Sequence, residues 1–160
     1  MARLTIDELA ALFEGRTRFT ERLAALEDPL ERAADVLRSL PEEEVLEALN
    51  AHPRIGERPA SSAAAAEQGT EDDPLVLAEL AALNAAYEAR FGFRFVVFVN
   101  RRPRSQIIPV LRERLQRTRE EELATAIEEL VAIARERHRR REEGRGKKEE
   151  GDDRIGAAPA

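Results

Sequence analysis

Residues 118–137 read TREEELATAIEELVAIARER, and this segment decides the class of the fold. It opens with Thr118-Arg119-Glu120-Glu121, a capping box in which a threonine and a glutamate satisfy backbone N–H groups at the start of a helix. Apolar residues then recur at intervals of four, three and four, which places them on one helical face; they are Leu123, Ile127, Leu130 and Ala134. The segment therefore predicts a long helix whose apolar face lies in a core.

Arg137 continues this apolar face, three residues after Ala134. A buried guanidinium without an anionic partner is unfavourable by several kcal/mol, so this position predicts a nearby anion. The alternative is an arginine at a fraying helix end, whose aliphatic part covers apolar surface while its charge reaches water. The sequence leaves both interpretations open. The neighbouring Arg135 and Arg139 are expected on the polar face.

Helix start signals recur along the rest of the chain. Each combines a capping residue or a proline with apolar residues at helical spacing: Thr5-Ile6-Asp7-Glu8, Asp28-Pro29-Leu30-Glu31, Ser39-Leu40-Pro41-Glu42 and Asp73-Pro74. Residues 63–68 are alanine-rich and predict a further short helix, which Gly69 can end. Pro109 is unfavourable inside a helix, so the helix of residues 105–116 is expected to begin nearer Ile107.

One segment, from Phe93 to Val99, is almost entirely β-branched or aromatic. Taken alone it predicts a strand, but the chain offers no second strand to pair with it, and a lone strand leaves its backbone groups unsatisfied. We therefore expect a buried extended segment whose N–H groups are free to bind something else. The predicted fold is all-α, a compact single-domain bundle of several helices.

The chain has 160 residues, enough for one domain with a core, and we place that domain at residues 1–138. Residues 139–160 mix charges of both signs with glycine and lack apolar spacing, which predicts a disordered, solvated tail. The many alanines, with lysine only at Lys147 and Lys148, suggest a GC-rich bacterial genome.

Composition also excludes several classes of protein. The absence of cysteine excludes disulfides, thiolate metal sites and a cysteine nucleophile, and the net charge of −6 argues against nucleic-acid binding. There is no apolar run of the ~20 residues needed to span a membrane, and the N-terminus lacks the apolar core of a secretory signal. A cytoplasmic protein is therefore expected.

His52-Pro53, at the end of a predicted helix, is the best candidate for chemistry. A neutral imidazole at an exposed, rigid corner can move protons near neutral pH, and Glu67 and Gln68 on the following helix could converge with it on a small molecule. The alternative is a histidine that caps the helix C-terminus, where its charge suits the dipole. No glycine-rich phosphate loop is present, and His52 and His138 are too isolated to predict a metal site, so no cofactor or metal is supported.

Four blocks of sequence, in order, resemble the motifs of the OHCU decarboxylase family, the 2-oxo-4-hydroxy-4-carboxy-5-ureidoimidazoline decarboxylases of urate catabolism. They are Ala51-His52-Pro53-Arg54-Ile55-Gly56, Glu67-Gln68-Gly69, the run LNAAYEARFGFRF at residues 83–95, and Ile133-Ala134-Arg135-Glu136-Arg137. The resemblance extends from about Leu9 to about His138. Together the blocks are specific, although each one alone is weak.

The resemblance implies an all-helical, cofactor-free enzyme that releases CO2 from the ureidoimidazoline to give (S)-allantoin; a homodimer would fit the family. The histidine of the His-Pro motif is the family's central catalytic residue, here His52. Glu67 and Arg137 complete the implied catalytic set. The implied substrate-binding residues are Pro53 and Gln68, with backbone groups of the extended segment at Phe95, Val96, Val97 and Phe98.

The implied chemistry is physically reasonable. Loss of CO2 leaves negative charge on a carbon, the adjacent unsaturated ring can accept it, and Arg137 offers a fixed positive charge. Contact between His52 and Glu67 would raise the pKa of the histidine.

Two positions depart from the family pattern. Ala64 stands where the family commonly has a serine three residues before the glutamate, and Arg16-Thr17-Arg18-Phe19 stands where a Ser-Pro-Trp-like segment is usual. Two alternatives therefore stay open. One is a catalytically impaired helical homologue with a binding or structural role, which Ala64 favours. The other is an enzyme acting on a related ureide or hydantoin ring.

Overall fold

The computed structural model describes residues 2–56 and 73–155, and within them it contains seven helices and no strand. The helices are α1 (Ile6–Leu12), α2 (Arg18–Ala24), α3 (Pro29–Ser39), α4 (Glu42–Asn50), α6 (Pro74–Phe91), α7 (Arg104–Arg114) and α8 (Arg119–Ile155). The prediction of an all-α fold is confirmed.

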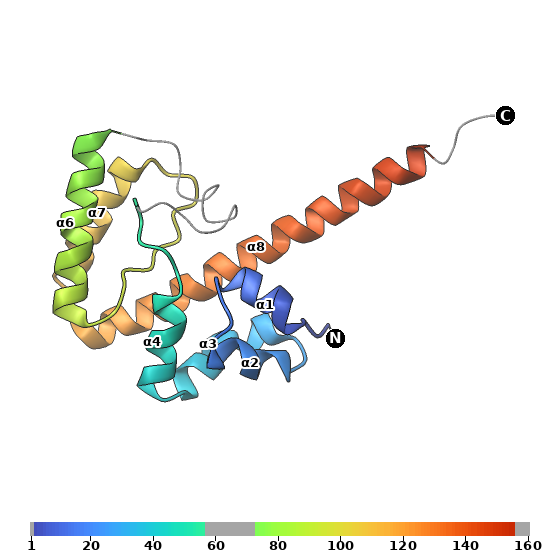
Figure 1. Cartoon of the computed structure of the whole chain (residues 1–160), viewed down its shortest axis with the longest axis horizontal. Helices are drawn as coiled ribbons and strands as arrows, with labels where there is room; N and C mark the ends of the chain where they lie inside the picture. The colour runs from blue at the N-terminus through green and yellow to red at the C-terminus, as the bar shows by residue number, and fades with distance from the viewer. Residues whose placement is uncertain (1, 57–72, 156–160) are drawn as a thin grey trace.

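Helix α8 is the element that organises the bundle (Figure 1). Its first half packs against α1, α3 and α4, and α2 fills the space between α1, α3 and α4. Helices α6 and α7 lie against each other at the other end of the molecule, near the start of α8. The predicted stripe explains this arrangement, because Ile127, Leu130 and Ala134 of α8 are all buried.

The helix ends largely follow the predicted signals. Thr5 and Glu8 form the expected capping box of α1, and Thr118 accepts from the backbone of Glu121 at the start of α8. Asp28 precedes α3 as predicted, but its side chain makes no capping bond and instead accepts from the backbone N–H of Ala2. Helix α2 was not predicted; its signal is a pair of threonines, of which Thr17 caps the first turn.

The predicted start of α7 near Ile107 is wrong. The helix begins at Arg104, directly after Pro103, and Pro109 lies inside it. Pro109 is exposed, whereas Ile107 and Leu111 are fully buried on the opposite side. Burial of these side chains outweighs the hydrogen bond that the proline cannot donate.

Residues 94–99 form the extended segment that the sequence predicted, and most of its side chains are buried. The Tyr87 ring packs against the Phe95 ring, with centroids 5.3 Å apart, and further contacts tie the segment to α7 and α8. Arg114 donates to the carbonyl of Val96 over 2.8 Å, and Glu129 accepts from the N–H of Phe98 over 3.2 Å. Side chains, not a neighbouring strand, thus satisfy part of its backbone.

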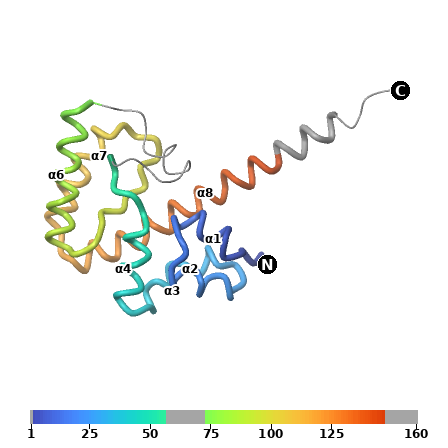
Figure 2. The backbone as a smooth tube through the Cα atoms, viewed as in Figure 1, coloured from blue at the N-terminus to red at the C-terminus, as the bar shows by residue number. Residues whose placement is uncertain are grey.

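Helix α8 continues past residue 138 to Ile155, over most of the segment for which the sequence predicts a solvated tail. Ion pairs between neighbouring turns account for this, as Arg139 pairs with Glu136 and Glu143. Up to residue 146 this part projects away from the body of the protein (Figure 2). The limit of the folded domain at residue 138 stays a prediction. Within the described residues, no helix has both the length and the apolar character needed to cross a membrane.

Candidate active site

His52 is buried, with only 5% of its surface exposed, whereas the sequence predicted an exposed corner. Helix α4 ends at Asn50, and the backbone N–H of His52 closes the last turn by donating to Leu49 over 3.2 Å. Pro53, three residues beyond the end of α4, cannot continue the helix. The Nε2 atom of His52 has no hydrogen-bond partner among the residues that the structure describes.

Burial, together with the positive charge of Arg137, lowers the pKa of His52 from its ordinary value to about 3. The imidazole is therefore neutral at pH 7. The increase expected from contact with Glu67 stays a prediction, because Glu67 lies outside the described residues. The lowered pKa also removes the interpretation of His52 as a charged cap on the helix dipole, because a neutral ring adds no charge there.

Arg137 is buried on the core-facing side of α8, and it has an anionic partner. Its Nη1 atom lies 2.9 Å from Oε1 of Glu14, and the two side chains are only 4% and 7% exposed. The same nitrogen donates to the carbonyl of Leu12 over 3.2 Å. The expectation of an anion beside Arg137 is confirmed, and the alternative of an arginine reaching into water is wrong.

Glu14 was not predicted as a site residue; it belongs to the turn between α1 and α2. Its φ is 64°, a left-handed conformation that is unusual for a residue other than glycine, asparagine or aspartate. The only feature of the sequence that pointed to a residue such as Glu14 was the expectation that Arg137 has an anionic partner. With 32 acidic residues in the chain, that expectation could not identify the partner.

The extended segment begins beside His52. The backbone N–H of Arg94 donates to Oδ1 of Asn50, and its Nη1 atom donates to the carbonyl of His52, both over 3.0 Å. No hydrogen bond of the described residues involves the backbone N–H groups of Phe95, Val96 and Val97. The predicted free amides therefore start next to the histidine. The amide of Phe98 is not one of them, because Glu129 accepts its proton.

The remaining predicted site residues are placed only in part. Pro53 is half-buried and directly follows His52. Glu67, Gln68 and the departure at Ala64 lie in residues 57–72, outside the described residues, as does the short helix expected at residues 63–68. Their roles stay predictions.

Comparison with known proteins adds the decisive observation. A family model described as OHCU decarboxylase matches residues 3–139. The chain belongs to the OHCU decarboxylase family. The match covers the body of the protein and both buried residues, His52 and Arg137, on which the candidate site is built.

Relatives of this OHCU decarboxylase family member agree with the assignment. The uric acid degradation bifunctional protein PucL of Bacillus subtilis (strain 168) is 30% identical over 140 residues, which cover 81% of this chain. The match spans only 28% of the length of that curated relative. A solved structure of OHCU decarboxylase in the presence of (S)-allantoin superposes with a TM-score of 0.68 at 28% identity, covering 82% of this chain and 94% of the other.

A more distant structure shares the fold. The crystal structure of (S)-allantoin synthase matches with a TM-score of 0.61 at 24% identity, covering 82% of this chain and 47% of that one. The helical architecture of this OHCU decarboxylase family member is therefore shared by solved structures.

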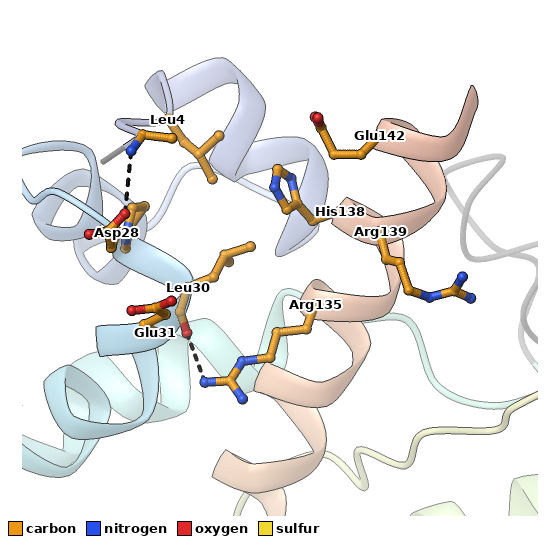
Figure 3. A pocket seen from close by; sticks show the side chains of 10 residues that line it. Leu4, Asp28, Leu30, Glu31, Arg135, His138, Arg139 and Glu142 are labelled. Atoms are coloured by element: carbon orange, nitrogen blue, oxygen red, sulfur yellow. Dashed lines mark hydrogen bonds between the residues drawn. The ribbon is translucent and has the colours of Figure 1, made fainter. Parts of the chain in front are cut away.

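Two cavities formed by described residues of this family member do not include His52 in their lining. One, of about 590 Å³, is an open pocket lined by the N-terminal segment, α3 and α8, and in Figure 3 His138 points from α8 toward Leu4 and Leu30. Arg135 and Arg139 also line it and are exposed, as predicted for the polar face of α8. The other, of about 390 Å³, lies beside the ion pair of Arg54 with Glu88. Neither is lined by His52 or Arg137.

The buried site thus combines two chemical capacities. A neutral imidazole has one nitrogen that donates and one that accepts, so it can transfer a proton. The guanidinium of Arg137 is a fixed positive charge where the low dielectric strengthens its interaction with an anion. In the described residues, no group of three or more histidine, aspartate or glutamate side chains could hold a metal ion.

Proposed function

We propose that this protein decarboxylates 2-oxo-4-hydroxy-4-carboxy-5-ureidoimidazoline to (S)-allantoin in urate catabolism, without a cofactor. One observation carries the proposal: a chain of the OHCU decarboxylase family buries a neutral histidine beside a buried arginine. The names of the similar proteins support it, since one belongs to uric acid degradation and another was studied in the presence of (S)-allantoin.

The reaction replaces a carboxylate with a proton. The bond between the ring carbon and the carboxylate breaks, CO2 leaves, and the electron pair moves into the adjacent unsaturated ring. A proton then adds to one face of the ring, which sets the configuration of the product. The protein must therefore orient the carboxylate, stabilise the developing negative charge and deliver the proton.

We assign the first two tasks to Arg137 and the proton transfer to His52. A guanidinium held in a water-poor site stabilises an anionic transition state more strongly than an exposed one, because its charge is less screened. His52 is neutral in the free protein, and the approach of the substrate carboxylate would raise its pKa toward the value needed for proton donation. Glu67 would act on His52 in the same direction.

The binding roles follow from position. Pro53 and Gln68 are proposed to contact the ureido group and the ring. The backbone N–H groups of Phe95, Val96 and Val97 are proposed to donate to carbonyl oxygens of the substrate, since they begin beside His52 and have no other partner among the described residues. Phe98 would contribute its ring or its carbonyl, because its amide is already used. We further propose a cytoplasmic location and a homodimer.

The test is a direct assay. Purified protein is mixed with freshly prepared ureidoimidazoline, and the decay of the substrate and the optical activity of the product are followed by circular dichroism. The proposal predicts faster decay than in buffer and optically pure (S)-allantoin. A rate equal to that of the buffer blank would reject it.

A second candidate function is a helical binding protein that keeps the fold and has lost turnover, and Ala64 is the observation that favours it. Ala64→Ser restores the hydroxyl that the family commonly has at this position. If the wild type is slow and Ala64→Ser is fast, the chain is an impaired homologue. If both turn over equally, the hydroxyl is dispensable and the second candidate loses its support.

A further inference from the structure

We propose that Glu14 is a positioning residue of the active site, whose carboxylate holds the guanidinium of Arg137 in the orientation that receives the anionic group of the substrate. The inference rests on the proposed function, because it gives Arg137 the task of binding that group. Glu14 would not touch the substrate; it would act through Arg137.

The first argument is geometric. Two acceptors from the end of α1, the carbonyl of Leu12 and the carboxylate of Glu14, contact the same Nη1 atom of Arg137 at 3.2 and 2.9 Å. A planar guanidinium fixed at one nitrogen by two acceptors has little freedom to rotate about its own axis. The turn between α1 and α2 thereby sets the direction of the whole donor group of Arg137.

The second argument is the backbone at Glu14. The described residues include four residues other than glycine with positive φ; Asp28 and Asn100 have short side chains that tolerate this conformation, and Arg101, at φ 61°, is exposed. Glutamate lacks that tolerance, and the side chain of Glu14, at φ 64°, is buried, so the strain there calls for a compensating interaction. The buried ion pair with Arg137 supplies one, and it is the interaction that a functional site would need to preserve.

The third argument is electrostatic. Arg137 alone would be a buried positive charge beside His52, and it would bind any small anion and hold the imidazole strongly deprotonated. With Glu14 attached, the pair is neutral overall, yet the guanidinium still presents donors with a defined orientation. The arrangement therefore favours an anion whose geometry matches the fixed donors over an anion that brings charge alone.

The test compares turnover in Glu14→Gln and in Glu143→Gln. Glutamine at residue 14 keeps the length of the side chain but removes the charge-assisted contact. Glu143 is the matched control, because it pairs with the exposed Arg139 on the projecting part of α8. Glu14→Gln is expected to lower kcat per folded molecule by about tenfold or more, with KM changed by less than about threefold, because misalignment of the donor affects the transition state most. Glu143→Gln is expected to change neither.

A double-variant cycle identifies Arg137 as the intermediary. If Glu14 acts through Arg137, then adding Glu14→Gln to an Arg137→Met protein causes no further loss of kcat. Multiplying losses would overturn the inference, as would a Glu14→Gln protein that is folded and turns over like the wild type. The double variant with Arg137→Met and Glu14→Gln removes both charges together, so it leaves no lone buried charge that could unfold the protein.

A readout independent of turnover separates this inference from the proposed function. In 15N NMR spectra, the Nη protons of Arg137 are expected to exchange slowly with water in the wild type and to lose that protection in Glu14→Gln. Unchanged signals in the variant would overturn the positioning role even in an active enzyme. Protected signals in a wild-type protein without decarboxylase activity would reject the proposed function and leave the fixing of Arg137 by Glu14 established.

Discussion

Among the described residues, two arginine–glutamate pairs lie in buried surroundings that differ. Glu122, fully buried, accepts from Arg114 and from the hydroxyl of Tyr87, each over 2.7 Å, and from Arg117 over 3.0 Å. The guanidinium of Arg114 also lies over the Phe95 ring. The pair of Arg137 and Glu14 instead lies near a histidine whose Nε2 atom has no partner among the described residues.

This difference lies in how the carboxylate of Glu122 and the imidazole of His52 are satisfied; Nη2 of Arg114 is itself buried without a hydrogen-bond partner among the described residues. The carboxylate of Glu122, on α8, accepts from Tyr87 of α6, from Arg114 of α7 and from Arg117 in the turn before α8, so it joins three helices. A buried polar atom without a partner, such as Nε2 of His52, is costly unless something else binds it. Family membership makes the substrate the natural candidate.

The largest expected effect is on turnover, from a change at His52. His52→Gln keeps a polar side chain of similar size but cannot transfer a proton, so kcat is expected to fall by about 10²- to 10⁴-fold while the helical circular dichroism spectrum is retained. Tyr87→Phe is the control from the other cluster. It is expected to keep turnover and to lower the free energy of unfolding by about 1 kcal/mol, because one hydrogen bond to Glu122 is lost. Equal losses of kcat in His52→Gln and Tyr87→Phe would show that the two buried clusters do not differ in their effect on turnover.

A large effect on stability is expected at the other pair. Glu122→Gln leaves Arg114 and Arg117 without their shared counter-charge, so the free energy of unfolding should fall by about 3–5 kcal/mol. Urea unfolding at pH 7 measures this change. Glu120→Gln, an exposed substitution in the same first turn of α8, serves as the control and should leave the midpoint nearly unchanged. A variant at Glu122 as stable as this control would show that the cluster around Glu122 does not hold the helices together.

A smaller effect on stability is expected from pH, and its sign follows from the lowered pKa of His52. Below its ordinary pKa of 6.5 the unfolded chain binds a proton at residue 52, while the folded protein, with a pKa of about 3, does not. The neutral ring of His52 therefore makes its full contribution to the free energy of unfolding above about pH 6.5. This contribution falls by about 1.4 kcal/mol per pH unit as the pH decreases toward 3.

Urea unfolding of the wild type and His52→Gln at pH 7, 6 and 5 isolates this contribution. The carboxylates that titrate at lower pH are common to both proteins, so the difference in slope belongs to residue 52. Equal slopes would mean that the folded protein also binds the proton, which is the behaviour expected if Glu67 pairs with the imidazole.

The sequence predicted which residues form the candidate site better than it predicted their burial and their partners. Helical spacing placed Arg137 on the buried face of α8, and the argument against an unpaired charge predicted an anionic partner. It could not identify Glu14, because the contact depends on a left-handed turn between α1 and α2 that no periodicity encodes. The burial of His52 was not predicted for a related reason. A histidine followed by a proline does not determine whether the side chain faces the core or the solvent.

The fold was predictable where local signals and packing agree. The capping boxes at Thr5 and Thr118 marked helix starts correctly, and the lack of a partner strand predicted the extended segment. Pro109 shows the opposite case, because the local preference against a helix was outweighed by burial of the side chains around it. Tertiary contacts of this kind cannot be read from one segment alone.

The smallest expected effect comes from a third arginine–glutamate group, which is exposed. Arg139 pairs with Glu136 and Glu143 on the part of α8 that projects from the body. Exposed pairs of this kind are screened by water and salt, so Arg139→Ala should leave the urea midpoint and kcat unchanged. It should only increase amide hydrogen exchange in the following turns, because residues 141–146 are all exposed and such pairs support the helix there.

Hydrogen exchange also decides the nature of this segment. If amides beyond residue 138 in the wild type exchange as fast as those of an unfolded peptide, the predicted tail holds and the ion pairs alone do not maintain the helix in solution. Protection that disappears in Arg139→Ala would show that the pairs do maintain it. In either case, an unchanged urea midpoint means that this exposed group contributes least to the free energy of unfolding. Water solvates its charges, whereas the charges of the two buried groups depend on protein partners.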